Sequence, residues 1–230
     1  MSERYDAEAV PIREAATLVL LRERALGTEV FMVRRTTSAV FSAGAHVFPG
    51  GALDDDDRDP ALLDRCEGLD DLRASKVLGL VSGGLGYFVA AIRECFEEAG
   101  MLLARRERHA DGELVRLDDA HVAQRFDDHR DALCRGTRSF LQICRAESLT
   151  LATDLLAPFG HWVTPLGPPR RFDTRFFVAH APDAQDASHD GQETTEAEWA
   201  RPIDLLGRAH RGEIDLILPT RRTLEALCAS

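Results

Sequence analysis

Residues 93–101 read Arg93-Glu94-Cys95-Phe96-Glu97-Glu98-Ala99-Gly100-Met101, and this stretch gives the most information about how the chain folds. At helical spacing, the apolar residues of the stretch and of the turn before it share one stripe: Phe88, Ile92, Cys95, Phe96 and Ala99. We expect this stripe to face the core. Gly100 is the predicted end of the helix, because glycine readily adopts the left-handed conformation that ends helices.

The opposite stripe of the same helix carries three carboxylates, from Glu94, Glu97 and Glu98, beside the small residues Ala90 and Ala91. The small side chains predict room for a ligand next to the acids. Carboxylates at the C-terminal end of a helix are unfavourable, because the helix dipole is negative there and the like charges repel one another. A hard divalent cation such as magnesium would remove this conflict by binding carboxylate oxygens. The pattern predicts a metal site, and a solvated acidic helix face is the alternative.

Composition narrows the class of protein. The chain has 230 residues and is 44% hydrophobic, which fits one domain with a full core. Its net charge of −11 disfavours binding to nucleic acid. We expect neither a membrane span nor a secretion signal, and therefore a cytoplasmic location. The five cysteines are scattered and form no Cys-x-x-Cys pair, which argues against a disulfide framework or a zinc site.

Predicted strands alternate with predicted helices along the chain. Strands are expected at 16–21, 30–34, 45–48, 159–164 and 172–180, and the first two form a hairpin. Besides the acidic helix, helical segments are expected at 61–66, 69–78, 118–133 and 137–147, after Trp199, and near the C-terminus. The glycines at 83, 84 and 86 are interpreted as a hinge, and 182–198 as a polar loop. Mixed strands with helices on both sides predict an α/β sandwich.

The pattern Arg93-Glu94-x-x-Glu97-Glu98-x-Gly100-Met101 resembles the second half of the Nudix box. That box begins with a glycine, followed after five residues by a glutamate. Here Gly51 fits the first position, and Asp57 stands where the glutamate is expected. A long insertion separates Asp57 from Arg93, which resembles the long-insert subgroup of Nudix enzymes that includes the peroxisomal coenzyme A diphosphatases.

Further segments resemble the same subgroup, from about residue 15 to the C-terminus. They are Phe41–Gly51, Trp162–Pro165, Arg171–Phe177, Glu193-x-x-Glu196-x-x-Trp199 and Leu218–Thr220. Gly44-x-x-x-Phe48-Pro-Gly-Gly matches the tail of the motif associated with coenzyme A hydrolysis, although Ala39 and Val40 replace the leucine-arginine pair expected before it. The resemblance implies a single Nudix domain over 1–230. Its fold would be an α/β/α sandwich with a mixed sheet and helical insertions at about 54–85 and 107–148.

The resemblance also implies roles for individual residues. Glu94, Glu97 and Glu98 would bind Mg²⁺ or Mn²⁺ together with the backbone carbonyl of Gly50, and Arg93 would position the carboxylates. Glu97, Glu193 and Glu196 are the candidates for the general base, with solvated loop positions as the alternative for the last two.

The predicted substrate contacts come from Gly51 and from the strand that follows residue 170. Arg171 and Arg175 share one face of that strand and are candidates for binding substrate phosphates. A structural salt-bridge row with Asp173 is the alternative.

The function implied is metal-dependent hydrolysis of a diphosphate bond in a nucleoside diphosphate derivative. Coenzyme A or acyl-coenzyme A, cleaved to 3′,5′-ADP and (acyl-)phosphopantetheine, is the preferred substrate, and NADH or ADP-ribose is the alternative. A nucleotide sensor without turnover is the alternative of another class, and the complete set of acids favours the enzyme. The two insertions are expected either to shape the substrate pocket or to form a homodimer contact.

Overall fold

A seven-stranded mixed sheet forms the centre of the computed structural model, which describes residues 10–36, 43–106, 112–188 and 194–229. Its strands are β1 (Ile12–Arg24), β2 (Gly27–Arg35), β3 (His46–Val47), β4 (Gly50–Ala52), β7 (Ala157–Val163), β8 (Arg171–His180) and β9 (Thr194–Ala200). The strand order is β3-β2-β1-β8-β7, with β4 paired to β1 and β9 paired to β2. The β1–β8 pair is parallel and the other pairs are antiparallel.

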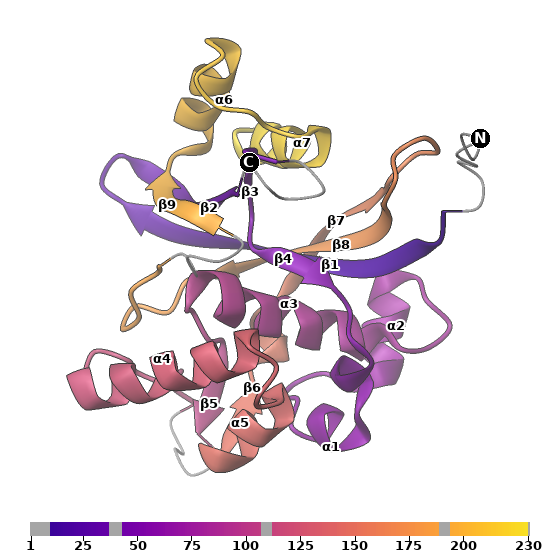
Figure 1. Ribbon diagram of the computed structural model, residues 1–230, viewed down its shortest axis with the longest axis vertical. Coiled ribbons are helices and arrows are strands. Elements are labelled where there is room, and N and C mark those ends of the chain that lie inside the picture. The colour runs from indigo at the N-terminus through magenta and orange to yellow at the C-terminus, as the bar shows by residue number, and fades with distance from the viewer. Residues whose placement is uncertain (1–9, 37–42, 107–111, 189–193, 230) are drawn as a thin grey trace, which may run out of the picture.

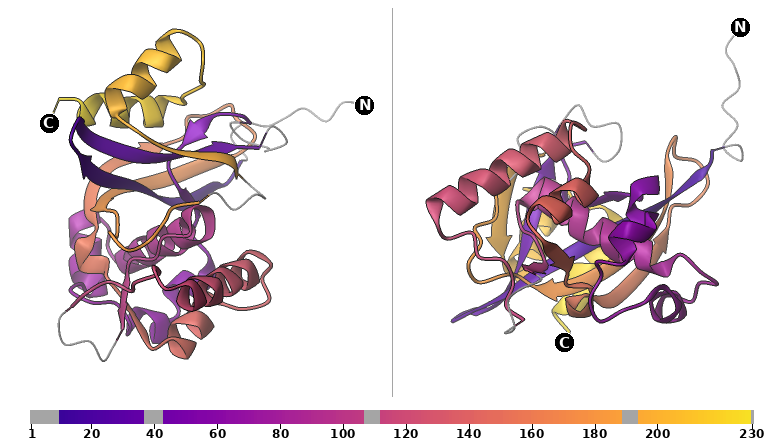
Figure 2. Two further views of the ribbon diagram at one scale, coloured as in Figure 1. Left: turned by 90° about the vertical axis from the view of Figure 1, so that its left-hand side faces the viewer. Right: turned by 90° about the horizontal axis from the view of Figure 1, so that it is seen from below.

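Helices cover both faces of this sheet, as Figures 1 and 2 show. Helix α3 (Gly84–Ala99) lies on one face, with α1 (Pro60–Leu63) and α2 (Asp71–Leu78) beside it, and α6 (Pro202–His210) and α7 (Leu218–Leu227) lie on the other. Alternate residues of β2 serve the two faces. Phe31 and Val33 point into the core under α3, whereas Val30 and Met32 point into the core under α6 and α7. The predicted α/β/α sandwich with a mixed sheet is confirmed.

The predicted insertions contain short elements of their own. The first holds a 3₁₀ turn (Asp55–Arg58), α1 and α2. The second holds α4 (Ala120–Cys134) and α5 (Phe140–Ala146), which lie next to a two-stranded sheet of β5 (Ala104–Arg106) and β6 (Leu149–Leu151). Asp119 and Ser139 cap α4 and α5 through their side chains.

Three expectations from the sequence need correction. The segment predicted as a polar loop at 182–198 ends in a strand, β9, because Ala197 and Trp199 alternate with acids and pack inward beside β2. The glycines at 84 and 86 lie inside α3 and do not form a hinge. Ala90 and Ala91 leave no room for a ligand, because both are fully buried in the core.

Within the described part of the chain, no helix combines the length and the apolar character that a membrane span requires.

Candidate active site

Helix α3 leaves two of the three glutamates, Glu94 and Glu97, partly accessible, whereas Glu98 is buried against β4. The helix begins after Gly83 and ends at Gly100, and both glycines adopt the left-handed conformation. Every residue of α3 is buried except Glu94 and Glu97, which are half-buried. The carboxylates of Glu94 and Glu97 therefore remain accessible to a ligand, although partial burial raises the free energy of their charged forms.

Arg93 is the centre of the site. Its Nε and Nη2 donate to the two carboxylate oxygens of Asp57 at 2.8 and 2.9 Å, and its Nη2 also donates to the carbonyl of Ala52 at 2.9 Å. Its Nη1 donates to Glu94 at 2.9 Å and to Glu97 at 3.2 Å. One guanidinium thus contacts two of the predicted metal ligands and joins α3 to the start of the first insertion, which is the arrangement that the predicted positioning role requires.

Asp57 is a site residue that the sequence placed in the motif but to which it gave no role. Its side chain is 1% exposed, and it also accepts a hydrogen bond from the backbone of Asp54. The sequence signal for Asp57 was its spacing from Gly51, which matches the motif although a long insertion follows Asp57. The insertion begins after Asp57 and ends before Arg93, and the ion pair between these two residues holds its two ends together.

Two adjacent glycines bring the main chain of β4 against the acids. The backbone N–H of Gly50 donates to Glu98 at 2.9 Å. A Cβ on Gly51 would lie 2.5 Å from Oε1 of Glu94, so only glycine leaves the carboxylate its place. The structure therefore brings together five predicted residues beside Arg93: Gly50, Gly51, Glu94, Glu97 and Glu98.

Burial raises the pKa of Glu94 to about 8, although Arg93 acts in the opposite direction. Burial also raises the pKa of Glu97, and again Arg93 opposes the shift. Arg93 stays protonated, because hydrogen bonds to Asp57 and the charge of Glu94 outweigh its burial and raise its pKa. The carboxylates of Glu94 and Glu97 therefore resist ionisation when no cation is bound, in spite of the neighbouring guanidinium.

The donor set fits a hard divalent cation, since every side-chain donor is a carboxylate oxygen. As the side chains stand, however, these oxygens bind protein donors. Across the residues described, no three histidine, cysteine, aspartate or glutamate side chains converge on one point as metal ligands. Glu94, Glu97 and Glu98 are the residues that would hold the ion.

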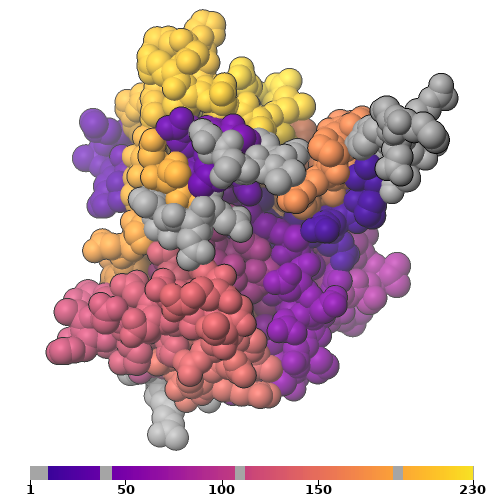
Figure 3. Space-filling model, viewed as in Figure 1, coloured from indigo at the N-terminus to yellow at the C-terminus, as the bar shows by residue number. Residues whose placement is uncertain are grey.

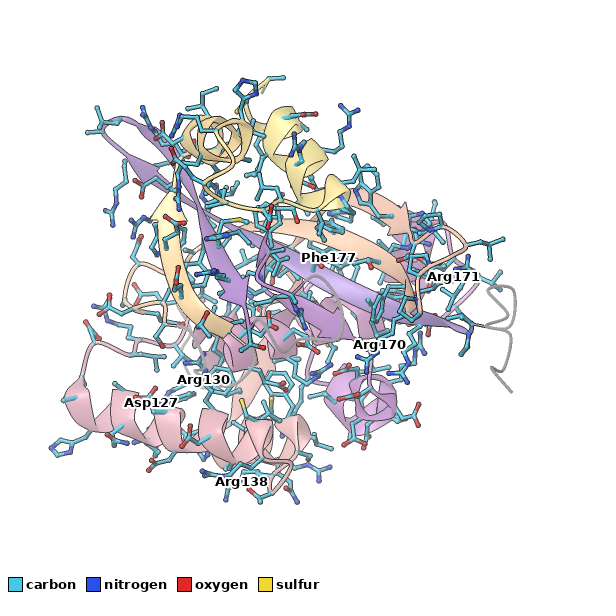
Figure 4. All side chains as sticks on the ribbon, turned by 45° about the horizontal axis from the view of Figure 1, so that its top comes forward. Asp127, Arg130, Arg138, Arg170, Arg171 and Phe177 are labelled. Atoms are coloured by element: carbon cyan, nitrogen blue, oxygen red, sulfur yellow. The ribbon has the colours of Figure 1, made fainter. Side chains whose placement is uncertain are left out.

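The remaining predicted residues lie elsewhere. Arg175 donates to the carbonyl of Leu78 at the end of α2 and lies 3.7 Å from Asp173, as the salt-bridge alternative expected. Arg171, the first residue of β8, donates to the carbonyl of Thr164 just after β7, and Figure 4 shows it far from Arg130 of α4. Their binding to phosphate stays a prediction.

Glu196 lies on the face of the sheet that α6 covers, opposite α3. It pairs with Arg34 at 2.7 Å and lines a polar hollow of about 180 Å³ together with His46 and Arg208. This placement does not bring it to Glu97. Glu193 lies outside the described residues, so its role as a base stays a prediction.

Comparison with known proteins finds matches over most of the chain. The family model of the NUDT19 Nudix domain matches residues 69–225. The crystal structure of a NUDIX hydrolase from Alicyclobacillus acidocaldarius is 32% identical, with a TM-score of 0.77 over 96% of this chain and 93% of that one.

Curated relatives point to the same group. Acyl-coenzyme A diphosphatase NUDT19 from Xenopus laevis is 26% identical over 87% of this chain, and the Homo sapiens protein of the same name is 28% identical over 77%. The matches cover 60% and 54% of those two relatives. The chain thus spans somewhat more than half the length of the curated relatives it matches.

Proposed function

The chain belongs to the Nudix family, as a NUDT19-type Nudix domain, and we propose that it hydrolyses the diphosphate bond of coenzyme A or of an acyl-coenzyme A. The products would be 3′,5′-ADP and phosphopantetheine or its acyl derivative. The observation that carries the proposal is the assembly of Glu94, Glu97 and Glu98 around Arg93 and the two glycines of β4. The choice of coenzyme A rests on the relatives named above and on the Gly44-x-x-x-Phe48-Pro-Gly-Gly motif.

A diphosphate resists hydrolysis because its negative oxygens repel a nucleophile. Mg²⁺ or Mn²⁺, held by Glu94, Glu97 and Glu98, would supply charge neutralisation and polarisation of the phosphoryl group. We propose this metal dependence because the side-chain donors are carboxylate oxygens and because the buried glutamates ionise unfavourably without a cation. The choice between the two metals is left to experiment.

In the reaction, the oxygen of a water molecule forms a bond to phosphorus and the bridging P–O bond breaks. The water proton has to reach a base. Glu97 is our candidate among the described residues, because its side chain is half-buried beside Glu94 and remains accessible to a ligand. Arg93 holds Glu97 and Glu94 in place, and the N–H of Gly50 holds Glu98.

The test is a product screen by mass spectrometry. Coenzyme A, acyl-coenzyme A, NADH, ADP-ribose and diadenosine polyphosphates would each be incubated with the protein and with Mg²⁺ or Mn²⁺. We expect 3′,5′-ADP from the two coenzyme A substrates. Rapid cleavage of NADH or ADP-ribose beside intact coenzyme A would overturn the substrate choice.

Two variants separate an enzyme from a sensor. Glu98→Gln keeps the shape of the side chain but removes a charged oxygen donor, so turnover should fall at least about a hundredfold. Glu225→Gln, an exposed position on α7, is the matched control and should retain full activity. Nucleotide binding by the wild type without turnover of any substrate would favour the sensor.

A further inference from the structure

Arg130 belongs to the second insertion, on α4, yet it is 7% exposed and lies against the C-terminal end of the carboxylate helix. Its Nε donates to the backbone carbonyl of Glu97 at 2.8 Å. Its Nη1 and Nη2 donate to the hydroxyl and the carbonyl of Ser188, each at 2.9 Å. One side chain thus joins three segments that are far apart in the sequence, and Figure 4 shows it on the inner side of α4.

The last carbonyls of a helix have no partner within the helix and need one elsewhere. In α3, Gly100 donates to the carbonyl of Phe96, Arg130 donates to that of Glu97, and Ser188 donates to that of Ala99 at 2.9 Å. The final turn, which carries Glu97 and Glu98, is therefore held from outside by Arg130 and by the residue that Arg130 fixes.

Arg130 packs closely against the end of α3 and carries the positive charge that the C-terminus of a helix favours. A Cβ on Gly100 would lie 3.1 Å from Nη1 of Arg130, which is closer than most such contacts. A fixed cation at the C-terminus also stabilises the helix dipole. The flat fork of a guanidinium reaches three acceptors at once, which the single ammonium of lysine does not reproduce.

We propose that Arg130 is a positioning residue for the metal-binding carboxylates, so that the second insertion supports the chemistry of α3. The inference rests on the proposed function, in which Glu97 and Glu98 bind a divalent ion. Arg130 touches neither substrate nor ion. It acts by keeping the backbone of the last helical turn in place, much as outer residues fix metal ligands in other sites.

The test compares Arg130→Lys and Arg130→Gln with Arg135→Gln, at the exposed residue that directly follows α4 and pairs only loosely with Asp131. Calorimetry with Mn²⁺ alone would give the metal affinity of each full chain, and circular dichroism would check its fold. Hydrogen exchange would report the amides of residues 97–101. We expect both Arg130 variants to bind Mn²⁺ about tenfold more weakly and to exchange faster at these amides, with Arg135→Gln unchanged.

Turnover adds a readout that a general loss of stability would not give. Excess Mn²⁺ should restore the rate of Arg130→Lys towards that of the wild type, because the defect lies in metal binding. If both Arg130 variants unfold, Ser188→Ala, which removes one acceptor of the fork, gives the same comparison with a smaller effect.

The outcomes separate this inference from the proposed function. Folded Arg130 variants with wild-type Mn²⁺ affinity would overturn the inference. A wild type that binds no Mn²⁺ would overturn both. Weaker Mn²⁺ binding by the variants of a wild type that cleaves no diphosphate would support the positioning role and refute the proposed activity.

Discussion

At the scale of single residues, the structure requires glycine at positions 50 and 51 for different reasons. The three atoms nearest to a Cβ on Gly51 would all belong to the flexible carboxylate of Glu94, whereas a Cβ on Gly50 would meet the carbonyl of Ala16 and, at 2.7 Å, the Cα of Thr17. Gly51→Ala should therefore displace Glu94 and reduce kcat/KM about 10- to 100-fold, with little loss of stability. Gly50→Ala should cost about 1–3 kcal/mol of stability, because backbone cannot move aside.

Urea unfolding and steady-state kinetics of both variants check this contrast. An active Gly51→Ala enzyme with wild-type metal affinity would show that the carboxylate of Glu94 does not need its present position.

Asp57 and Arg93 form an ion pair in which both side chains are almost fully buried, at 1% and 6% exposed. Asp57→Asn leaves part of the guanidinium charge without its partner, and such losses cost about 3–5 kcal/mol. We expect a value near the lower end, since Glu94 and Glu97 still contact Arg93. The midpoint of urea unfolding measures it, with Asp127→Asn on the exposed side of α4 as the control. Equal stability of the two variants would contradict this account.

His46 predicts how stability depends on pH. Burial lowers its pKa from 6.5, only partly opposed by Glu198. Its Nδ1 has no hydrogen-bond partner among the described residues. The unfolded chain therefore binds a proton that the folded chain resists, so the contribution of His46 to stability is present above about pH 6.5 and is lost as the pH falls below it.

Unfolding free energies measured between pH 5 and 7.5 test this expectation. His46→Gln should flatten the acid side of the curve, whereas His210→Gln, at an exposed position of α6, should leave it unchanged. Parallel curves for the wild type and His46→Gln would refute it.

At the scale of elements, α3 shows what local pattern can and cannot predict. The position of the helix, its end at Gly100 and its acidic residues followed from spacing and charge. The burial of Ala90 and Ala91 did not, because helical periodicity does not show which elements from elsewhere cover the second face. The acids of β9 hid a strand for a similar reason, since Glu196 and Glu198 alternate with the inward residues Ala197 and Trp199. Arg130 gave no signal at all, because its partners are two backbone carbonyls and one serine hydroxyl of distant segments.

Gly84 is the element-scale example with a direct test. A Cβ there would collide with backbone of Ser75 in α2, so the glycine allows α2 and α3 to touch. Gly84→Ala should separate the two helices and cost about 1–3 kcal/mol. Gly79 adopts a left-handed conformation and would be strained by alanine, so it cannot serve as the control. The control is Ala61→Gly, a mild change at the start of α1. If Gly84→Ala left the melting temperature unchanged, the close contact would not be needed.

At the scale of the whole molecule, the second insertion is part of the same body as the sheet. In Figure 3, α4 and α5 (pink) lie directly against the purple central segments and do not form a separate lobe. Phe126 of α4 is 1% exposed and meets Phe96 of α3 edge to face, with 6.4 Å between ring centroids. The same core includes Phe31 and Phe177 of the sheet. Sequence spacing located the insertion, but only the packing shows that it shares the core.

A shared core predicts one cooperative unfolding transition. Phe126→Ala should cost about 3–5 kcal/mol, because it leaves a cavity between α3 and α4. The loss should appear equally in far-ultraviolet circular dichroism and in the fluorescence of Trp162 and Trp199, which belong to β7 and β9. Leu72→Ala, at a side chain that is 77% exposed on α2, is the control and should change the midpoint little. If Phe126→Ala shifted the dichroism midpoint but not the fluorescence midpoint, α4 would unfold separately from the sheet. The insertion would then fold as a separate unit, and Arg130 alone would account for its stabilising effect on the last turn of α3.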